Sequence, residues 1–348
     1  MKAMLVREPN RYELSDVPVP RIASGEALVR VEACGICGTD IDIIEGNRPM
    51  EVTAYPVILG HEFSGEVVEV GSEVKEVRPG DKVAVDTVIR CSGCRNCAMG
   101  WTAHCLTAYN QIGCTIPGGM AEYVAVPQRQ LYKLPDSLHV VDAALAEPGS
   151  CAAHGVSKAD IRPGDSVVVI GVGPIGALTL QFGRLFSPAH LISVEIDDRK
   201  LELARKLGAT HAVSARHQDV TTAIMDITHG LGADAIIECS GSLDSIQKTF
   251  SYVGTKGRIV VIGVPSERKF EIDFLSLLLR DALFRPSNGY TTQIWLWVLQ
   301  LLSSGAIDTR TIVTHRFPLS QIDKAFSMLR TREECAIKVL TSPQWREQ

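Results

Sequence analysis

The stretch that decides the fold of the second half of the chain is SVVVIGVGPIG, residues 166–176. Its first part is a run of β-branched apolar residues, which is typical of a buried strand. Three glycines follow in the spacing G-x-G-x-x-G, and an apolar-periodic segment then predicts a helix. The motif comprises Gly171, Gly173 and Gly176, with Pro174 and Ile175 before the last glycine. In this order the glycines permit a tight turn, a close backbone approach to a pyrophosphate, and close packing of the helix on the strand.

The segment after this helix supplies a second signal of nucleotide binding. The run LISVEI predicts the next strand and brings Glu195 to 19 residues beyond Gly176. An acidic residue at this place accepts hydrogen bonds from the adenine ribose hydroxyls and repels a 2′-phosphate. Arg199 is close by in the sequence and counts in the opposite direction. Together with the helix N-terminus, which attracts phosphates, the motif predicts a dinucleotide site, and Glu195 favours NAD over NADP.

The two halves of the chain differ in their patterns. Short alternating runs separated by glycine and proline fill the first half, which predicts a β-rich domain of the barrel or sandwich type. From about residue 150, apolar runs alternate with helical patterns as far as KGRIVVIGV, residues 256–264. This alternation predicts βαβ units and a parallel, doubly wound sheet. A helical run at 293–305 and a strand-like segment, AIKVL, complete the chain.

Composition narrows the class of protein. The 348 residues are 45% hydrophobic and 22% charged, which is ordinary for a globular protein of two domains. The net charge of −5 argues against a nucleic-acid partner, which would require a basic stripe. The N-terminus lacks the apolar region of a secretory signal, and no apolar run reaches the length of a membrane span. The ten cysteines therefore indicate metal binding or packing in a reducing cytoplasm rather than disulfides.

A compact cysteine motif lies in CSGCRNCAMGWTAHC. The spacing C-x2-C-x2-C-x7-C brings together Cys91, Cys94, Cys97 and Cys105. Four thiolates this close form a closed tetrahedral shell around zinc, at about 2.3 Å, with no position left for a substrate. An iron–sulfur cluster also takes four thiolates, but the rest of the chain decides against it. We therefore predict a structural zinc that holds a loop.

A second set of candidate metal ligands lies upstream. Cys37 follows a predicted strand in the glycine-flanked turn ACGICGTD, and His61 and Glu62 are adjacent in LGHEFSG. Thiolate, imidazole and carboxylate all bind zinc, and three protein ligands plus water is the pattern of a catalytic site. Adjacent residues point to opposite faces of a regular strand. Both could therefore bind one metal only where the chain turns around it.

These motifs together resemble the zinc-dependent medium-chain alcohol dehydrogenases over essentially the whole chain. The stretch 60–74 fits G-H-E-x2-G-x5-G-x2-V, which is similar to the signature of that family. The CGICGTD segment, the four cysteines and the glycine motif with Glu195 occur in the family's order. The resemblance implies an α/β protein: a GroES-like β-rich catalytic domain, residues 1–152 completed by 290–348, and a Rossmann domain with a doubly wound parallel sheet, residues 153–289.

The resemblance also assigns zinc ligands. It implies that Cys37 and His61 bind the catalytic zinc, and Glu62 matches a carboxylate that is a ligand in the polyol branch. Glu147, in ALAEPGSC, stands where ordinary alcohol dehydrogenases carry a third cysteine. The sorbitol- and threonine-dehydrogenase-like branches have glutamate there, bound directly or through water. Cys151, four residues further on, is the competing candidate, but the E-P context favours Glu147.

Further matches concern proton transfer. Asp40 resembles the carboxylate that orients the zinc histidine and fixes its tautomer, and Thr39 matches the hydroxyl that takes the substrate's proton. Relatives in the polyol and threonine branches often carry histidine where this chain has Asp42. Two roles stay open for Asp42, a proton relay or a solvated carboxylate. The difference also counts against a threonine dehydrogenase, because that branch relies on the histidine.

The substrate is the least constrained part of the resemblance. Arg285, in FRPSNGY, resembles the arginine that sorbitol dehydrogenases bring to the polyol, and its several donors suit hydroxyl groups. Lys338 resembles a tail cation near the cofactor pyrophosphate. The resemblance predicts oxidation of a secondary alcohol, most closely a polyol or sugar, with a 2,3-butanediol or L-threonine 3-dehydrogenase as alternatives. A zinc-stabilised NAD-binding protein without turnover is the alternative from a different class.

The predicted cofactors are NAD and two zinc ions per chain, one catalytic and one structural. The predicted partner is a small alcohol or polyol, with no nucleic acid and no membrane. The resemblance further implies a homodimer or homotetramer, in which Rossmann sheets join edge to edge near residues 256–264.

Overall fold

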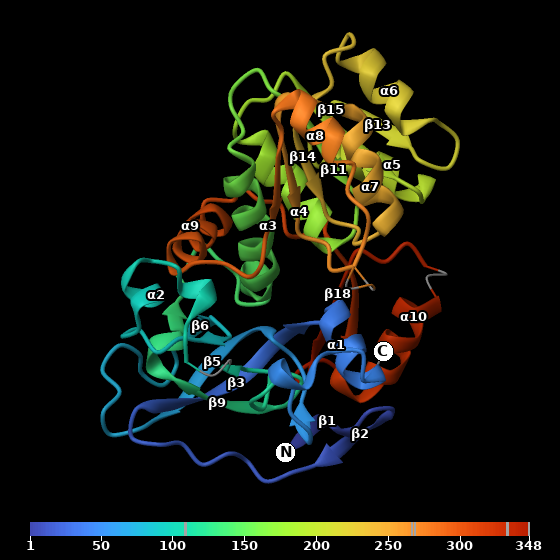
Figure 1. Cartoon of the computed structure of the whole chain (residues 1–348). Coiled ribbons are helices and arrows are strands. Elements are labelled where there is room, and N and C mark those ends of the chain that lie inside the picture. Colours follow the sequence, from blue (N-terminus) through green and yellow to red (C-terminus); the bar gives the residue numbers. More distant parts are fainter. Residues whose placement is uncertain (108–109, 266, 268, 332–333, 347–348) are drawn as a thin grey trace. The chain divides into compact units, whose positions relative to one another are not determined.

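The structure is a computed structural model that describes residues 1–348 except 108–109, 266, 268, 332–333 and 347–348. The chain forms two compact units, Met1–Glu147 with Thr291–Gln348, and Pro148–Tyr290 (Figure 1). The first unit is therefore built from both ends of the chain. The first boundary lies a few residues earlier than residue 152, because it falls inside a continuous helix, α3 (Ala146–Ala159), where nothing in the sequence marks a break.

The second unit is a parallel sheet flanked by helices (Figure 1). Its strands lie in the order β13–β12–β11–β14–β15–β16, and every pairing between neighbours is parallel. The strands are β11 (Ser166–Ile170), β12 (His190–Glu195), β13 (His211–Ser214), β14 (Ala233–Glu238), β15 (Val253–Val261) and β16 (Leu283–Pro286). The helices are α4 (Pro174–Arg184), α5 (Leu201–Lys206), α6 (Val220–Ile227), α7 (Leu243–Tyr252) and α8 (Phe274–Arg280), with a 3-10 turn η5 (Asp198–Lys200) before α5. This strand order is the doubly wound arrangement that the alternating pattern predicts.

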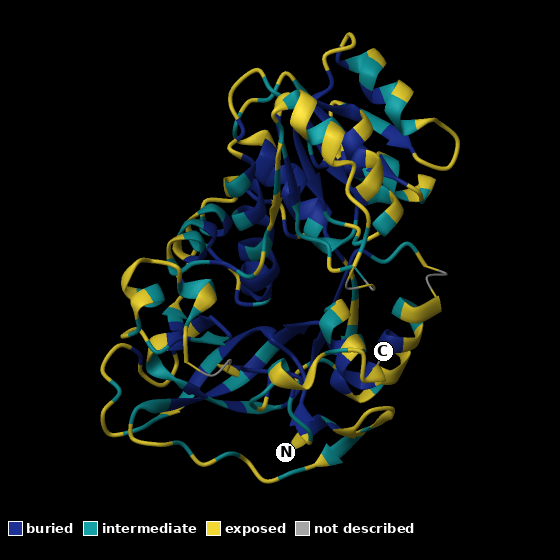
Figure 2. Ribbon diagram, viewed as in Figure 1, coloured by how far each residue is buried: buried dark blue, intermediate teal, exposed yellow. Residues whose placement is uncertain are grey.

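The central strands of this sheet are apolar on both faces because helices cover both. All five residues of β11 are buried, and Val167, Val168 and Val169 have no exposed surface (Figure 2). A parallel strand that is covered on both sides requires such a continuous apolar run. At the other side of the sheet, residues 258–261 of β15 hydrogen-bond to strands on both flanks, β14 and β16. Residues 256–264 therefore lie mainly in the strand next to the edge strand, β16, and the joining of two sheets near them stays a prediction.

The first unit is built mainly from antiparallel strands. Its largest sheet has the order β10–β6–β5–β3–β18–β17, and β9 also pairs with β3. Two smaller sheets have the orders β2–β1–β4 and β7–β8. The strands are β1 (Lys2–Glu8), β2 (Arg11–Asp16), β3 (Glu26–Gly35), β4 (Val57–Ile58), β5 (Glu62–Val70), β6 (Lys82–Val85), β7 (Val88–Ile89), β8 (Asn110–Gln111), β9 (Tyr123–Pro127), β10 (Leu131–Lys133), β17 (Val313–Pro318) and β18 (Lys338–Ser342). The two ends of the chain thus share one sheet.

Short helices connect these strands. The α-helices are α1 (Gly38–Glu45), α2 (Arg95–Ala98), α9 (Thr292–Ser303) and α10 (Ile322–Thr331). The 3-10 turns are η1 (Met50–Val52), η2 (Thr102–His104), η3 (Gln128–Gln130), η4 (Asp142–Leu145) and η6 (Leu319–Gln321). Across the described part of the chain, no helix combines the length and the apolar character that crossing a membrane requires.

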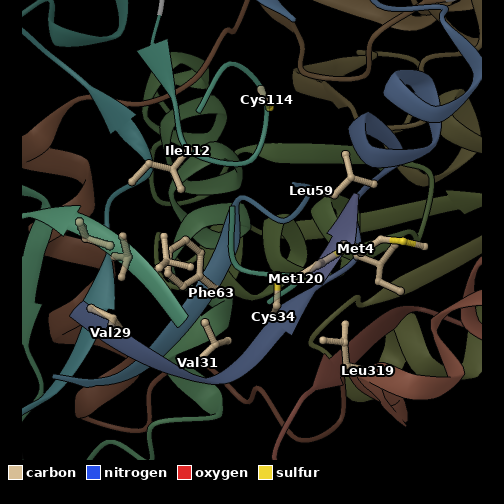
Figure 3. Close-up of a cluster of buried hydrophobic side chains, with 14 of the residues drawn as sticks. Met4, Val29, Val31, Cys34, Leu59, Phe63, Ile112, Cys114, Met120 and Leu319 are labelled. Carbon is tan, nitrogen blue, oxygen red and sulfur yellow. The ribbon is translucent and has the colours of Figure 1, made fainter. Parts of the chain in front are cut away.

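The core of the first unit lies next to the residues that the sequence analysis singled out. Phe63 of β5 packs with side chains of β3, and Cys34 lies near Met120 in the same buried cluster (Figure 3). Burying a large apolar side chain contributes roughly 1.5–3 kcal/mol, so this cluster holds the ends of β3 and β5 firmly. The C-terminal strand β18 pairs with the end of β3 through Thr341 and Cys34. This pairing brings the tail of the chain to the turn that carries Cys37.

Candidate active site

Three candidate ligands gather where β3 ends and β5 begins. The thiol sulfur of Cys37, a ring nitrogen of His61 and a carboxylate oxygen of Glu62 all lie within 4.8 Å of one another. His61 and Glu62 are buried, and Cys37 is partly exposed. Thiolate, imidazole and carboxylate are the donor types that zinc prefers, so the residues present fit this metal.

The backbone around Cys37 is held by the helix that follows it. Cys37 is the N-cap of α1 and has an extended conformation. Its backbone N–H donates to Asp40 Oδ2 at 2.8 Å, and the Asp40 N–H donates to the Cys37 carbonyl at 3.1 Å. This reciprocal arrangement satisfies free groups of the first helical turn and fixes the direction of the Cys37 side chain.

Glycine at position 60 allows two adjacent side chains to reach the same place. Gly60 has φ +100°, and a Cβ there would lie 2.6 Å from both Cys34 Sγ and the Met120 backbone nitrogen. The chain therefore turns at Gly60, and His61 precedes the first residue of β5, Glu62. Because His61 lies outside the regular strand, the alternation of side chains does not separate it from Glu62.

Asp40 stands behind the imidazole. Its Oδ1 lies 3.5 Å from His61 Nδ1, and Asp40 is completely buried. Burial lowers the pKa of His61, but the carboxylate of Asp40 and the thiol of Cys37 raise it more, so that the pKa lies well above its ordinary value in the metal-free protein. A carboxylate beside the outer nitrogen of a metal-binding histidine orients the ring, as the resemblance implies for Asp40.

Lys338 lies in this cluster. Its Nζ forms an ion pair with Glu62 Oε2 and donates a hydrogen bond to the Ile36 carbonyl at 2.9 Å. The exposed fractions of the Lys338 and Glu62 side chains are only 1% and 2%. Burial lowers the pKa of Lys338, but Glu62 and Cys37 raise it more, so the ammonium stays charged.

The role of Lys338 at the cofactor pyrophosphate stays a prediction, which its pairing with Glu62 does not test. The described contacts of its ammonium are with Glu62 and Ile36, both in the first unit. The pairing of β18 with β3 decides the place, because it brings the C-terminal strand to the end of the strand that precedes Cys37. The signal that sequence reasoning missed is a lone lysine in the apolar run AIKVL, which requires a buried counter-ion.

Glu147 is near enough to this cluster to respond to its charges. It is buried at the beginning of α3. Burial raises the pKa of Glu147 to about 7, while His61 and Lys338 act to lower it and Glu62 acts to raise it. A glutamate with this pKa ionises readily when a cation binds beside it. Glu147 as a further zinc ligand stays a prediction, as does the competing role of Cys151, which is one helical turn later in α3.

The residues expected to move protons lie on α1. Thr39 is partly exposed in its first turn, and Asp42 is exposed three residues later. Residues three apart lie on the same face of a helix, so the two side chains are neighbours. Partial burial and the nearby Glu45 raise the pKa of Asp42, whereas Arg48 acts to lower it.

The four-cysteine motif forms a second candidate metal centre. The sulfur atoms of Cys91, Cys94, Cys97 and Cys105 all lie within 4.8 Å of one another. The Cys94 and Cys105 sulfurs are 4.0 Å apart, far longer than a disulfide bond of about 2.05 Å. This arrangement matches the closed tetrahedral zinc shell that the spacing predicts.

Backbone groups already favour thiolates in this loop. The N–H of Cys91 donates to Cys105 Sγ at 3.4 Å, and the N–H of Leu106 donates to Cys94 Sγ at 3.4 Å. The first of these bonds lowers the pKa of the Cys105 thiol to about 6, and the Leu106 bond lowers the pKa of Cys94. Burial raises the pKa of Cys97 to about 12 in the metal-free protein. The loop is thus partly prepared for a cation.

The glycine motif of the second unit has the geometry of a phosphate-binding turn. Gly171 follows β11 with φ +87°, Gly173 is the N-cap of α4, and Pro174 occupies the first helical turn. A Cβ at Gly176 would lie 1.7 Å from the Gly171 carbonyl oxygen, so only glycine fits there. The loop leaves β11 next to β14, where the strand order reverses, which is the place where doubly wound sheets bind nucleotides.

Glu195 lies near this turn and accepts hydrogen bonds from backbone N–H groups. At the end of β12, its Oε2 accepts the Val172 N–H at 2.6 Å, and its Oε1 accepts the N–H groups of Ile196 and Asp197 at 2.8 and 2.9 Å. A carboxylate has about four acceptor positions, so Glu195 supports the turn and still has capacity for a ribose hydroxyl. Arg199 is paired with Asp197, with Nη2 and Oδ2 2.7 Å apart.

Arg285 is exposed on the edge strand β16 of the second unit. The partial burial of Lys158 lowers the pKa of that lysine, and the nearby positive charge of Arg285 lowers it further. The role of Arg285 at the substrate stays a prediction.

Comparisons with known proteins agree with this combination of sites. Residues 23–136 match the family model of the alcohol dehydrogenase GroES-like domain, and residues 174–304 match that of the zinc-binding dehydrogenases. The chain is 31% identical over 349 residues to a sorbitol dehydrogenase of Bacillus subtilis (strain 168), covering 99% of this chain and 97% of that protein. It is 33% identical over 355 residues to an L-threonine 3-dehydrogenase of Bacillus velezensis, covering 99% of both chains.

The fold is also shared with solved structures. A protein described as a zinc-binding dehydrogenase from Sinorhizobium meliloti 1021, bound to NADP, superposes with a TM-score of 0.92 at 33% identity. The match covers 98% of this chain and 99% of that protein. These likenesses confirm the α/β fold with a GroES-like part and a doubly wound sheet. This chain belongs to the zinc-dependent medium-chain alcohol dehydrogenase family.

Proposed function

We propose that this protein oxidises a secondary alcohol with NAD as hydride acceptor, most closely a polyol or sugar. The observation that carries the proposal is the cluster of partly exposed Cys37 with buried His61 and Glu62, and Thr39 is two residues from Cys37. A bound zinc supplies a Lewis acid for the substrate oxygen, and the nicotinamide supplies the redox chemistry. A protein that only stores zinc or NAD has no need of a partly exposed thiol and a hydroxyl beside a buried His–Asp pair.

The surrounding residues prepare the site. Asp40 orients the imidazole of His61. Lys338 offsets the negative charge of Glu62, which reduces the cost of burying that carboxylate. The Thr39 hydroxyl takes the proton of the substrate alcohol and passes it outward. Asp42, on the same exposed face of α1, is the next acceptor, in place of the histidine of many relatives.

We propose that Glu62 and Glu147 are the two carboxylates that tune the metal, bound directly or through water. Glu62 lies in the ligand cluster. Burial raises the pKa of Glu147 to about 7, and the negative charge of Glu62 also acts to raise it. Replacing each by glutamine and measuring zinc content tests the assignment. A direct ligand should lower the affinity for the catalytic zinc, whereas a variant with full affinity and changed turnover would identify an indirect role.

NAD is the proposed cofactor because Glu195 ends β12 beside the glycine turn, where its charge opposes a 2′-phosphate. The pairing of Arg199 with Asp197 supports this choice, since the guanidinium already has a carboxylate partner. The similar protein from Sinorhizobium meliloti is bound to NADP, which makes a direct comparison necessary. The ratio of kcat/KM for NAD and NADP measures the preference, and a ratio below one would refute this assignment.

The experiment that tests the substrate is a panel assay of NADH formation on zinc-replete protein. The panel contains sorbitol, xylitol, other polyols, 2,3-butanediol, L-threonine and simple alcohols. Turnover on polyols, reduced by Arg285→Gln with simple alcohols unaffected, supports the polyol assignment. Turnover only on 2,3-butanediol or L-threonine would keep the chemistry and refute the role of Arg285. No turnover, with two zinc ions and NADH bound, would favour the non-catalytic alternative.

We also propose that the protein is a cytoplasmic homo-oligomer, a dimer or tetramer. No disulfide joins any of the ten cysteines, which fits a reducing compartment. The edge strand β16 offers unpaired backbone groups, and α8 beside it exposes Phe274, Leu275, Leu278 and Leu279 by 62–75%. Exposed apolar faces of this kind mark association sites. Leu278→Glu should reduce the molar mass in light scattering, and an unchanged mass would locate the interface elsewhere.

A further inference from the structure

The first unit contains a cavity that none of the candidate metal ligands lines. It has a volume of about 350 Å³ and is lined by His139, Val141, Asp142, Arg310, Arg316 and Trp345. Its lining includes no candidate zinc ligand and none of the residues of the nucleotide site. The volume lies at the lower end of the range of small-molecule sites, which is the size of a single sugar-sized ligand.

Two guanidinium groups line this one cavity without a carboxylate partner. Among the described residues, no Asp or Glu oxygen lies within 4.0 Å of a side-chain nitrogen of Arg310 or Arg316. Arg310 and Arg316 are both exposed residues, so their guanidinium groups are accessible to a ligand that enters from solvent. Two like charges that face one hollow repel each other, and an anion between them removes that repulsion.

Asp308, the acidic residue nearest to Arg310 in the sequence, accepts hydrogen bonds from the backbone. Asp308 Oδ1 accepts the N–H groups of Arg310 and Thr311 at 2.9 and 3.2 Å. The same carboxylate therefore holds the turn that presents Arg310. The planar fork of an arginine donates two parallel hydrogen bonds to a phosphate, and this geometry favours phosphate over a small spherical anion.

The third hydrogen-bond donor is His139, and its backbone contact assigns its tautomer. The Val141 N–H donates to His139 Nδ1 at 3.3 Å. The imidazole accepts at Nδ1, so its hydrogen is placed on Nε2, which is left as a donor. The adjacent Asp142 contributes a carboxylate to the same lining, and a carboxylate accepts hydrogen bonds from sugar hydroxyls.

The C-terminal tail supplies an aromatic wall. The residue before Trp345 is anchored twice: the Gln344 N–H donates to Ser342 Oγ at 3.0 Å, and its Nε2 donates to the Val31 carbonyl at 3.3 Å. Trp345 is half-buried in the lining of the cavity. An indole face packs against the C–H groups of a sugar ring, and its N–H can reach a hydroxyl.

We propose that this cavity binds a phosphorylated sugar, with the phosphate between Arg310 and Arg316 and the sugar between Trp345 and Asp142. The ligand is a second small molecule, distinct from the alcohol that is oxidised. The residues come from three segments of the first unit, 139–142, 310–316 and the tail, so binding would tie these segments together.

Isothermal titration of zinc-replete protein saturated with NADH tests the proposal. The probes are glucose 6-phosphate, inorganic phosphate and glucose, because NADH already occupies the nucleotide site. We expect saturable binding of glucose 6-phosphate, weaker binding of phosphate, and none of glucose. Arg316→Gln and Arg310→Gln should each weaken binding roughly ten- to a hundredfold, which corresponds to the loss of a charge-assisted hydrogen-bonded contact. The turnover of the alcohol substrate in the absence of sugar phosphate should not change.

Arg346→Gln is the matched control, because Arg346 is exposed beside Trp345 and does not line the cavity. It should bind glucose 6-phosphate as the wild type does. Trp345→Phe should weaken glucose 6-phosphate more than inorganic phosphate. An equal loss in Arg346→Gln would show general attraction to a positive surface and overturn the proposal. No saturable binding by the wild type, or equal affinities for phosphate and glucose 6-phosphate, would overturn it as well.

Discussion

Replacing Lys338 by methionine should destabilise the metal-stripped protein strongly and in a pH-dependent way. Lys338 and Glu62 form an ion pair with exposed fractions of 1% and 2%, and the ammonium also donates to the Ile36 carbonyl at 2.9 Å. Methionine has a similar length and fills the same space without the charge. The variant therefore leaves the Glu62 carboxylate buried without the ammonium that pairs with it. Removing only one partner of a buried ion pair is strongly destabilising.

The magnitude follows from two limits. Removing one partner of a buried pair costs about 3–5 kcal/mol. A glutamate without a partner can instead take up a proton, and keeping an ordinary glutamate protonated at pH 7 costs about 3.5 kcal/mol. Protonation thus caps the loss at pH 7 at about 3–4 kcal/mol, and it lowers the cap to about 1 kcal/mol near pH 5. In a unit of this size, the loss at pH 7 is a fall of roughly 6–16 °C in Tm.

The assay is urea unfolding of the metal-stripped protein, followed by circular dichroism at pH 5 and pH 7. Lys248→Met is the control, because Lys248 and Asp244 form an exposed pair with side-chain exposures of 58% and 72%. Such a pair contributes less than about 1 kcal/mol, so the control should change little at either pH. Adding Glu62→Gln to Lys338→Met should recover most of the stability, because the buried charge is then absent.

Two results would refute the reasoning. A loss below about 1 kcal/mol at pH 7 would mean that the pair is hydrated and contributes as a surface pair does. A large loss that is equal at pH 5 and pH 7, and that Glu62→Gln does not reduce, would mean that packing rather than charge is responsible.

Further predictions concern the three other parts of the site. A Cβ at Gly173 meets nothing within 4 Å, so Gly173→Ala should keep the wild-type Tm and raise the Kd for NADH. Gly176→Ala would place a Cβ 1.7 Å from the Gly171 oxygen, so it should raise this Kd and also lower the Tm. Equal melting and equal loss of NADH affinity in both variants would contradict the assignment of the turn. Cys37→Ser should abolish turnover with the fold intact. Cys94→Ser should instead lose one zinc equivalent and lower the Tm. A Cys94→Ser enzyme with an unchanged Tm and a lower turnover rate would show that the cysteine loop has a chemical role. Burial raises the pKa of Glu147 to about 7, so the folded metal-stripped protein holds this proton more tightly than the unfolded chain, and its stability should fall as pH rises from about 4.5 to about 7, by up to about 3 kcal/mol. Urea unfolding at a series of pH values measures this slope, and Glu147→Gln should flatten it.

Local patterns in the sequence were enough for much of this protein. The run Val167–Ile170 with its three glycines predicted a strand, a turn and a helix, because periodicity and glycine conformation act within a few residues. The spacing of Cys91, Cys94, Cys97 and Cys105 likewise predicted a four-sulfur cluster that the structure brings within 4.8 Å. In both cases the residues that act together lie within one short segment, so spacing alone limits their geometry.

Only the tertiary structure decided which distant residues meet. Cys37 and Glu62 come together because β3 and β5 pair, and Lys338 joins them because a strand from the other end of the chain pairs with β3. The same kind of pairing made β16 the edge of the parallel sheet instead of β15. These arrangements depend on strand order and core packing over the whole chain. The run AIKVL therefore indicates that Lys338 needs a counter-ion, but it does not identify Glu62 as that partner.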